Sequence, residues 1–155
     1  MKPQAHVLLV DGSRVTLRGK VHSWAEHQAA QGMALARTCE AEVTVMMVYE
    51  PYPYIAAAAE YDSYQVQLAE DLRQEAEQTV QTARDSVQAA GLQVASHVME
   101  SQKAWRSILD VSQSDKADLI VMGSHGRSGL DKLVMGSVTQ RVLQHTRLPV
   151  LVVRD

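Results

Sequence analysis

The chain has 155 residues, of which 46% are hydrophobic, and it carries a formal net charge of −3 with an isoelectric point near 6.0. A domain of this length buries roughly 70% of the surface that its unfolded chain exposes, so one domain can fold without disulfides or a structural metal. The slightly acidic charge argues against nucleic acid or an anionic membrane as a partner. The single cysteine, Cys39, excludes an internal disulfide and makes a zinc site of the usual kind improbable.

The apolar runs of the sequence are all short. None approaches the roughly 18–20 residues that a membrane-spanning helix needs. The run that begins at Val7 stops at Asp11, so the beginning of the chain does not resemble a signal peptide. We therefore expect a cytoplasmic protein without membrane contact.

Short, unbroken apolar runs alternate with longer segments of mixed polarity. A continuous apolar run of four to seven residues is typical of a strand buried on both faces of a parallel sheet. Runs that are wholly or mostly apolar predict five strands, at residues 7–10, 43–49, 94–99, 119–122 and 150–153. Helical spacing predicts four helices, at residues 23–39, about 62–90, 105–112 and from 138 onward.

This alternation predicts a single α/β domain over residues 1–155, built on a doubly wound, five-stranded parallel sheet. Capping patterns mark three helix ends. Ser23 with Glu26 and Ser137 with Gln140 each match a capping box, and Gly91 suits the position after a helix.

Residues 14–22, between the first strand and the first helix, have no clear periodicity. Arg14, Arg18, Lys20 and His22 are interleaved with apolar residues. A solvated loop explains these charges, and a small hairpin or a surface facing an anion are the alternatives.

The segment from Gly123 to Ser137 is rich in glycine, with four of the chain's eight glycines. A strand, a glycine-rich loop and a helix start together present backbone N–H groups to a phosphate. The segment lacks the lysine of a P-loop, and its G-x-x-G-x-x-G spacing differs from the dinucleotide-binding G-x-G-x-x-G. The alternative interpretation is a surface loop that ends in an ordinary helix cap.

Asp11 and Gly123 follow the first and fourth predicted strands. Doubly wound sheets bind ligands outside the carboxyl ends of their strands, at the point where the winding direction reverses. If these two strands are neighbours, Asp11 and the glycine loop lie at one crevice.

The run Gly123-x-x-Gly126, followed by nine residues and Gly136-Ser137, is similar to the ATP-binding motif of universal stress proteins. Residues 119–127 and 149–153 also resemble members of that family closely. The resemblance implies a Rossmann-like sheet of strand order 3-2-1-4-5 and a homodimer joined through Val150–Val153. It further implies ATP with Mg²⁺ or Mn²⁺ as ligands.

The resemblance also implies roles for individual residues. Adenine would lie beside Val48, and the ribose near Asp11 and Gly123, with Met122 as a further nucleotide-binding residue. The phosphates would lie on Gly126, Gly136, Ser137 and Val138. A carboxylate that accepts from ribose hydroxyls and a helix N-terminus that meets polyphosphate are each chemically sensible.

The sequence departs from the family pattern at three places. Leu9 stands where a proline is common, residues 102–104 replace a common Gly-x-Pro, and roughly nine residues are inserted at about 14–22. The inserted segment could cover the nucleotide, add an arginine to the phosphates, or block the site.

The leading functional hypothesis is an ATP-binding regulatory protein of the stress response. A weak ATPase or autophosphorylating enzyme is an alternative, since Ser124, Ser128 and Ser137 offer hydroxyls, but His125 is the loop's one histidine and no base is assembled around it. A nucleotide-free dimeric adaptor is the third hypothesis, and the intact glycine motif argues against it.

Overall fold

A computed structural model describes residues 6–10, 24–50, 62–124 and 135–153. The elements alternate in the order β1 (His6–Val10), α1 (Trp24–Cys39), β2 (Glu42–Tyr49), α2 (Asp62–Ala89), β3 (Val94–Glu100), α3 (Ala104–Ser114), β4 (Leu119–Gly123), α4 (Ser137–His145) and β5 (Val150–Val153). The predicted α/β architecture with parallel strands is confirmed. None of the described helices is both long enough and apolar enough to cross a membrane.

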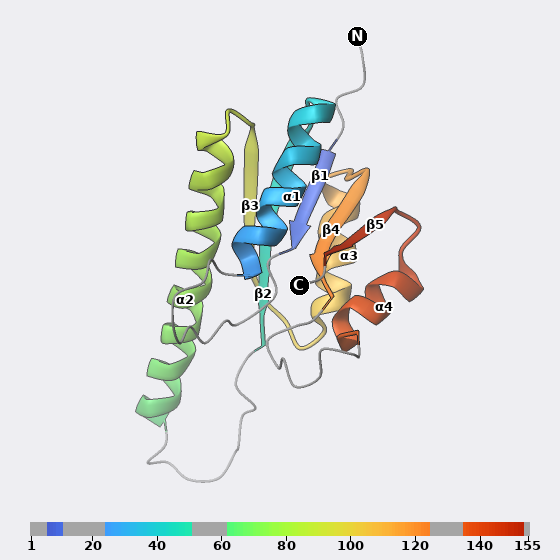
Figure 1. The fold of residues 1–155 in the computed structure, drawn as a ribbon. Coiled ribbons are helices and arrows are strands. Elements are labelled where there is room, and N and C mark those ends of the chain that lie inside the picture. Colours follow the sequence, from blue (N-terminus) through green and yellow to red (C-terminus); the bar gives the residue numbers. More distant parts are fainter. Residues whose placement is uncertain (1–5, 11–23, 51–61, 125–134, 154–155) are drawn as a thin grey trace.

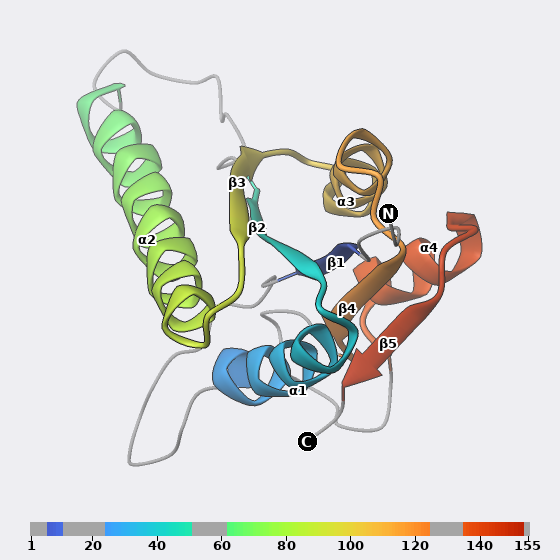
Figure 2. The same ribbon diagram turned by 90° about the horizontal axis from the view of Figure 1, so that it is seen from above.

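The five strands form one sheet in the order β3-β2-β1-β4-β5, and every neighbouring pair is parallel. Helices α1 and α2 cover one face of the sheet, and α3 and α4 cover the other (Figures 1 and 2). The chain thus winds in one direction from β1 to β3 and in the other direction through β4 and β5. Since β1 and β4 are neighbours, the winding reverses between them.

Strand β2 shows why the predicted strands are continuous apolar runs. Its side chains alternate between two hydrophobic clusters, one on each face of the sheet. Val45 and Met47 pack on the face of α1 and α2, while Met46 and Val48 pack on the face of α3 and α4. A strand with helices on both sides is therefore apolar at almost every position.

Helix α2 ends as the sequence predicts. Gly91 has a φ of 79°, and its N–H donates to the carbonyl of Gln88 at 2.9 Å. Left-handed backbone of this kind costs little for glycine and more for residues with a Cβ.

One polar group ties the amino-terminal end of the sheet to α3. Oδ2 of Asp115 accepts hydrogen bonds from Oγ1 of the fully buried Thr44 and from Nε2 of His97, both at 3.0 Å. Its Oδ1 accepts from Ser114 at 2.9 Å. Burial raises the pKa of Asp115, but the hydrogen bonds from His97, Ser114 and Thr44 outweigh it and hold that pKa below its ordinary value. The ionised carboxylate therefore joins β2, β3 and α3.

Asp115→Asn should lower the free energy of unfolding by about 1–2 kcal/mol at pH 7, because hydrogen bonds to an ionised carboxylate become neutral ones. The folded-state pKa lies below the unfolded value of about 3.9, so this stabilisation is present above that pH and is lost as pH falls through the folded pKa. Urea unfolding at pH 7 and pH 3 should show that the difference in free energy of unfolding between wild type and variant is smaller at pH 3. Asp110→Asn, an exposed change on the same helix, is the control. A gap of equal size at both pH values would contradict a role for the ionised carboxylate.

Candidate functional site

The carboxyl ends of β1 and β4 lie next to each other at the point where the winding reverses. Val10, the last residue of β1, is in register with Met46 of β2 and Met122 of β4. The glycine-rich segment leaves the sheet from β4, directly after Met122. Asp11 and Gly126, two of the predicted nucleotide-binding residues, lie outside the described residues.

Three hydrogen bonds connect the end of β4 to its neighbours. The N–H of Ser124 donates to the carbonyl of Val153 at 2.9 Å, and the N–H of Gly136 donates to the carbonyl of Ser124 at 2.7 Å. Oγ1 of Thr139 donates to the carbonyl of Gly123 at 2.9 Å. Ser124 and Thr139 are 1% and 2% exposed, so these bonds are shielded from water. They fix the first turn of α4 against the end of β4.

Among the described residues, no side chain caps the N-terminus of α4. Gly136 occupies the N-cap position, and the first backbone bond of the helix runs from the N–H of Gln140 to the carbonyl of Gly136 at 3.0 Å. The N–H groups of Ser137, Val138 and Thr139 precede that bond in the first turn. Amides that precede the first intrahelical bond, together with the helix dipole, form an arrangement that binds anions.

The predicted capping box of Ser137 and Gln140 is wrong. Ser137 is the first helical residue and not the cap, and Nε2 of Gln140 donates to the carbonyl of Met135 at 2.9 Å. Gly136 has φ −59° and ψ 147°, an extended conformation that places the helix start one residue after it. The alternative interpretation of this segment, an ordinary helix cap that needs no ligand, therefore loses its main support.

Val48, Met122 and Val138 belong to the hydrophobic cluster on the face of α3 and α4. The side chains of Val48 and Met122 are 9% and 3% exposed, so they are mainly part of the core. Val138 packs against the same cluster from the first turn of α4. The structure thus brings these three predicted residues together in one cluster, and it gives Val48 and Met122 little side-chain surface for direct contact with a ligand.

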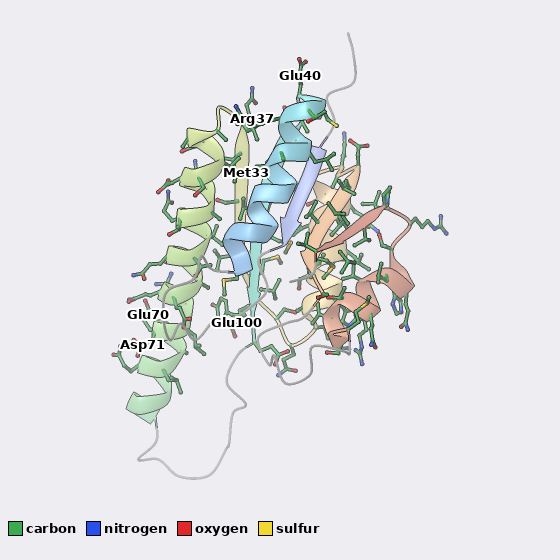
Figure 3. The ribbon with its side chains drawn as sticks, in the orientation of Figure 1. Met33, Arg37, Glu40, Glu70, Asp71 and Glu100 are labelled. Atoms are coloured by element: carbon green, nitrogen blue, oxygen red, sulfur yellow. The ribbon has the colours of Figure 1, made fainter. Side chains whose placement is uncertain are left out.

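The carboxylate of Glu100 also lies at this end of the sheet. Glu100 ends β3 and accepts a hydrogen bond from the Tyr49 hydroxyl at 3.3 Å. Arg37 and Glu40 lie at the opposite end of the molecule (Figure 3). Burial raises the pKa of Tyr49, and the negative charge and hydrogen bond of Glu100 raise it further. Tyr49 thus remains a neutral hydrogen-bond donor at physiological pH.

Within the described ranges, no three His, Cys, Asp or Glu side chains are grouped as metal ligands.

Sequence reasoning missed Thr139, which holds α4 in place. Its hydroxyl reaches the carbonyl of a residue 16 positions earlier in the chain. A threonine three residues after the last glycine of the motif was the one available signal. That spacing alone does not reveal the strand residue it contacts.

Thr139→Val should lower the free energy of unfolding by about 1–2 kcal/mol, because the buried carbonyl of Gly123 loses its side-chain donor while the side-chain shape is kept. Thr139→Ser should retain most of the stability. Thr82→Val is a matched control, since the hydroxyl of Thr82 bonds a carbonyl of its own helix and is exposed. Urea unfolding measures all three, and a Thr139→Val protein as stable as wild type would contradict this role.

A family model described as the universal stress protein family matches residues 7–154. The chain belongs to the universal stress protein family. A universal stress protein of Methanocaldococcus jannaschii is 30% identical over 148 residues, which cover 96% of this chain and 80% of that protein.

Solved structures of universal stress proteins share the fold. UspA from Lactobacillus plantarum has a TM-score of 0.76 at 20% identity, with 97% of each chain covered. A universal stress protein from Archaeoglobus fulgidus, solved in complex with dAMP, has a TM-score of 0.58 at 20% identity, with 98% of each chain covered. At such identities the likeness shows the fold alone, and the dAMP belongs to that structure.

Proposed function

We propose that this universal stress protein binds ATP at the carboxyl ends of β1 and β4 and acts as a nucleotide-dependent regulatory protein of the stress response. The observation that carries the proposal is the uncapped N-terminus of α4, held against the end of β4 directly after the glycine-rich segment. Its amides offer the phosphates a binding site that the helix dipole favours. The dAMP complex of a protein with the same fold supports an adenine nucleotide as ligand.

The proposed site combines described residues with residues outside the described ranges. Ser137 and Val138 would meet the phosphates with their amides, beside Gly136. Gly123 would lie at the ribose together with Asp11, whose carboxylate suits ribose hydroxyls. Gly126 completes the glycine motif. Val48 and Met122 would form the base of the crevice. They would contact adenine through backbone atoms and the small exposed part of their side chains.

Mg²⁺ or Mn²⁺ would enter with the nucleotide. The ion would be bound mainly by phosphate oxygens and water. That is the usual manner in which Mg²⁺ accompanies nucleotides.

Ser137→Asp should weaken ATP binding by at least about tenfold, because it adds a negative charge where the phosphates would lie. The same change should leave the fold intact, since an acidic residue in the first turn of a helix is favourable. Isothermal titration with ATP and Mg²⁺ measures the affinity, and thermal unfolding measures the stability.

Ser137→Asn is the matched control, because it has the shape of aspartate without the charge. It should bind ATP within about threefold of wild type, which is well under the effect of a charge at this distance. Absence of heat with wild type at millimolar ATP would refute the proposed function. Equal affinity of the Asp and Asn variants would show that phosphate does not bind at α4.

The same experiments separate the alternatives. Mass spectrometry of gently purified protein should detect co-purifying ATP or ADP, which would exclude a nucleotide-free adaptor. Steady release of phosphate from ATP would instead establish an enzyme. Among the described residues no observation favours either alternative.

We also propose that two chains pair through β5. This strand is at the edge of the sheet, and an apolar edge strand is a site of unwanted association unless it is paired. The odd-numbered residues of this segment face β4: the carbonyl of Pro149, just before β5, accepts from Ile120, and the carbonyl of Val153 accepts from Ser124, just after β4. In a parallel ladder the alternate residues face the other way, so the N–H groups of Val150 and Val152 point to the open edge.

Val152→Pro should convert a homodimer to a monomer, because it removes a donor at the open edge and leaves the bonds to β4 in place. Leu151→Pro is the contrasting variant, since Leu151 is in register with Val121 and its loss should destabilise the sheet itself. Analytical ultracentrifugation gives the oligomeric state and circular dichroism gives the fold. A folded Val152→Pro protein that stays dimeric would exclude this interface.

A further inference from the structure

A second candidate binding site lies at the amino-terminal end of the sheet. It is a cavity of about 400 Å³ between the last turns of α3 and α4 and the beginnings of β4 and β5. The nucleotide site proposed above lies at the carboxyl ends of the strands, around the opposite end of α4. Cavities of this size hold small metabolites.

The base of the cavity is apolar. Leu109, Ala117 and Leu148 line it, and all three belong to or pack against the hydrophobic cluster beneath α3 and α4. Ala117 is 5% exposed, so the base is continuous with the protein core. A ligand's apolar portion would be shielded from water there.

Three basic side chains also line the cavity. Lys116 follows α3, His145 ends α4, and Arg147 lies in the connection to β5. Among the described residues, no carboxylate forms an ion pair with any of them. The neighbouring Asp115 is already bonded to Thr44, His97 and Ser114.

The position of His145 is fixed by two contacts. Its Nδ1 donates to the carbonyl of Arg141 at 2.8 Å, and its ring lies 4.6 Å from the ring of Trp105. Nδ1 is thereby used within α4, which leaves Nε2 as the ring nitrogen that can donate to an anion when the imidazole is protonated. Basic residues at helix C-termini stabilise helices through the dipole. That explanation suits His145, in the last turn of α4, but does not account for Lys116 and Arg147, which each lie two residues beyond the end of a helix, or for the apolar cavity between them.

We propose that this cavity binds a small organic anion with an apolar body. The body would pack on Leu109 and Leu148, and a carboxylate or phosphate group would lie among Lys116, His145 and Arg147. Arginine pairs with either group through two parallel hydrogen bonds, and lysine contributes a point charge. The site is separate from the nucleotide site and does not depend on it.

Trp105 provides a reporter for this site, because it contacts His145. The chain has two tryptophans, so Trp24→Phe leaves Trp105 as the sole indole. In that background, and with saturating ATP and Mg²⁺ present, phenyl phosphate and benzoate would be titrated into the millimolar range at pH 7. We expect a saturable change in Trp105 fluorescence with at least one of them, and the stronger binder identifies the preferred acidic group. Benzamide, the neutral analogue of benzoate, should give none.

Lys116→Gln and Arg147→Gln should each weaken binding by about tenfold, because each removes one charged contact to the anion. Arg84→Gln on α2 makes the same charge change far from the cavity and should bind as wild type does. Thermal unfolding verifies that every variant is folded. If one of the two cavity variants does not fold, the other is enough for the test. Absence of saturable binding by both anions, equal binding of benzamide, or unchanged affinity in the cavity variants would overturn the proposal.

Discussion

The hydrogen bond from the Gly136 N–H to the Ser124 carbonyl, 2.7 Å long, joins the two ends of the segment 125–134. Bringing the two ends of this segment together costs entropy, and hydrogen bonds of the fold offset that cost without a ligand. Thr139 adds a second link, from the first turn of α4 to Gly123. These contacts set the position and direction of the helix N-terminus, on which the proposed nucleotide site depends. A ligand would find the amides of α4 already oriented, which lowers the ordering cost of binding.

A parallel sheet with helices on both faces gives its two ends different chemistry. At the carboxyl ends of the strands, helices begin and present N–H groups, and α4 does so without a side-chain cap. At the amino ends, helices finish and present carbonyls, which favour basic residues such as His145. Asp115 lies at this second end, where its charge is balanced by donors from β2, β3 and α3. The separation of two proposed anion sites, one based on amides and one on basic side chains, follows from this asymmetry.

The elements were predictable because each has a local cause. Strand β2 is buried on both faces and is almost wholly apolar in sequence, and Gly91 marks the end of α2 through its positive φ. The bond between His97 and Asp115 was not predictable, since it joins two elements with no shared spacing. The start of α4 was misjudged because the letters S-x-x-Q are the same whether Ser137 caps the helix or begins it. The candidate site was predictable only as a motif; Asp11 and Gly126 lie outside the described residues, so their roles stay predictions.

Helix α4 links the two proposed sites, with Ser137 at one end and His145 at the other, nine residues in all. Coupling between ligands at its ends would require the helix to have two positions that the ligands stabilise differently. Its inner face opposes this, because Thr139 is bonded to the sheet and Val142 is fully buried. Close-packed cores resist small continuous shifts. The contacts of α4 therefore favour independent binding at its two ends, and regulation by nucleotide would have to pass through other parts of the chain or through a partner.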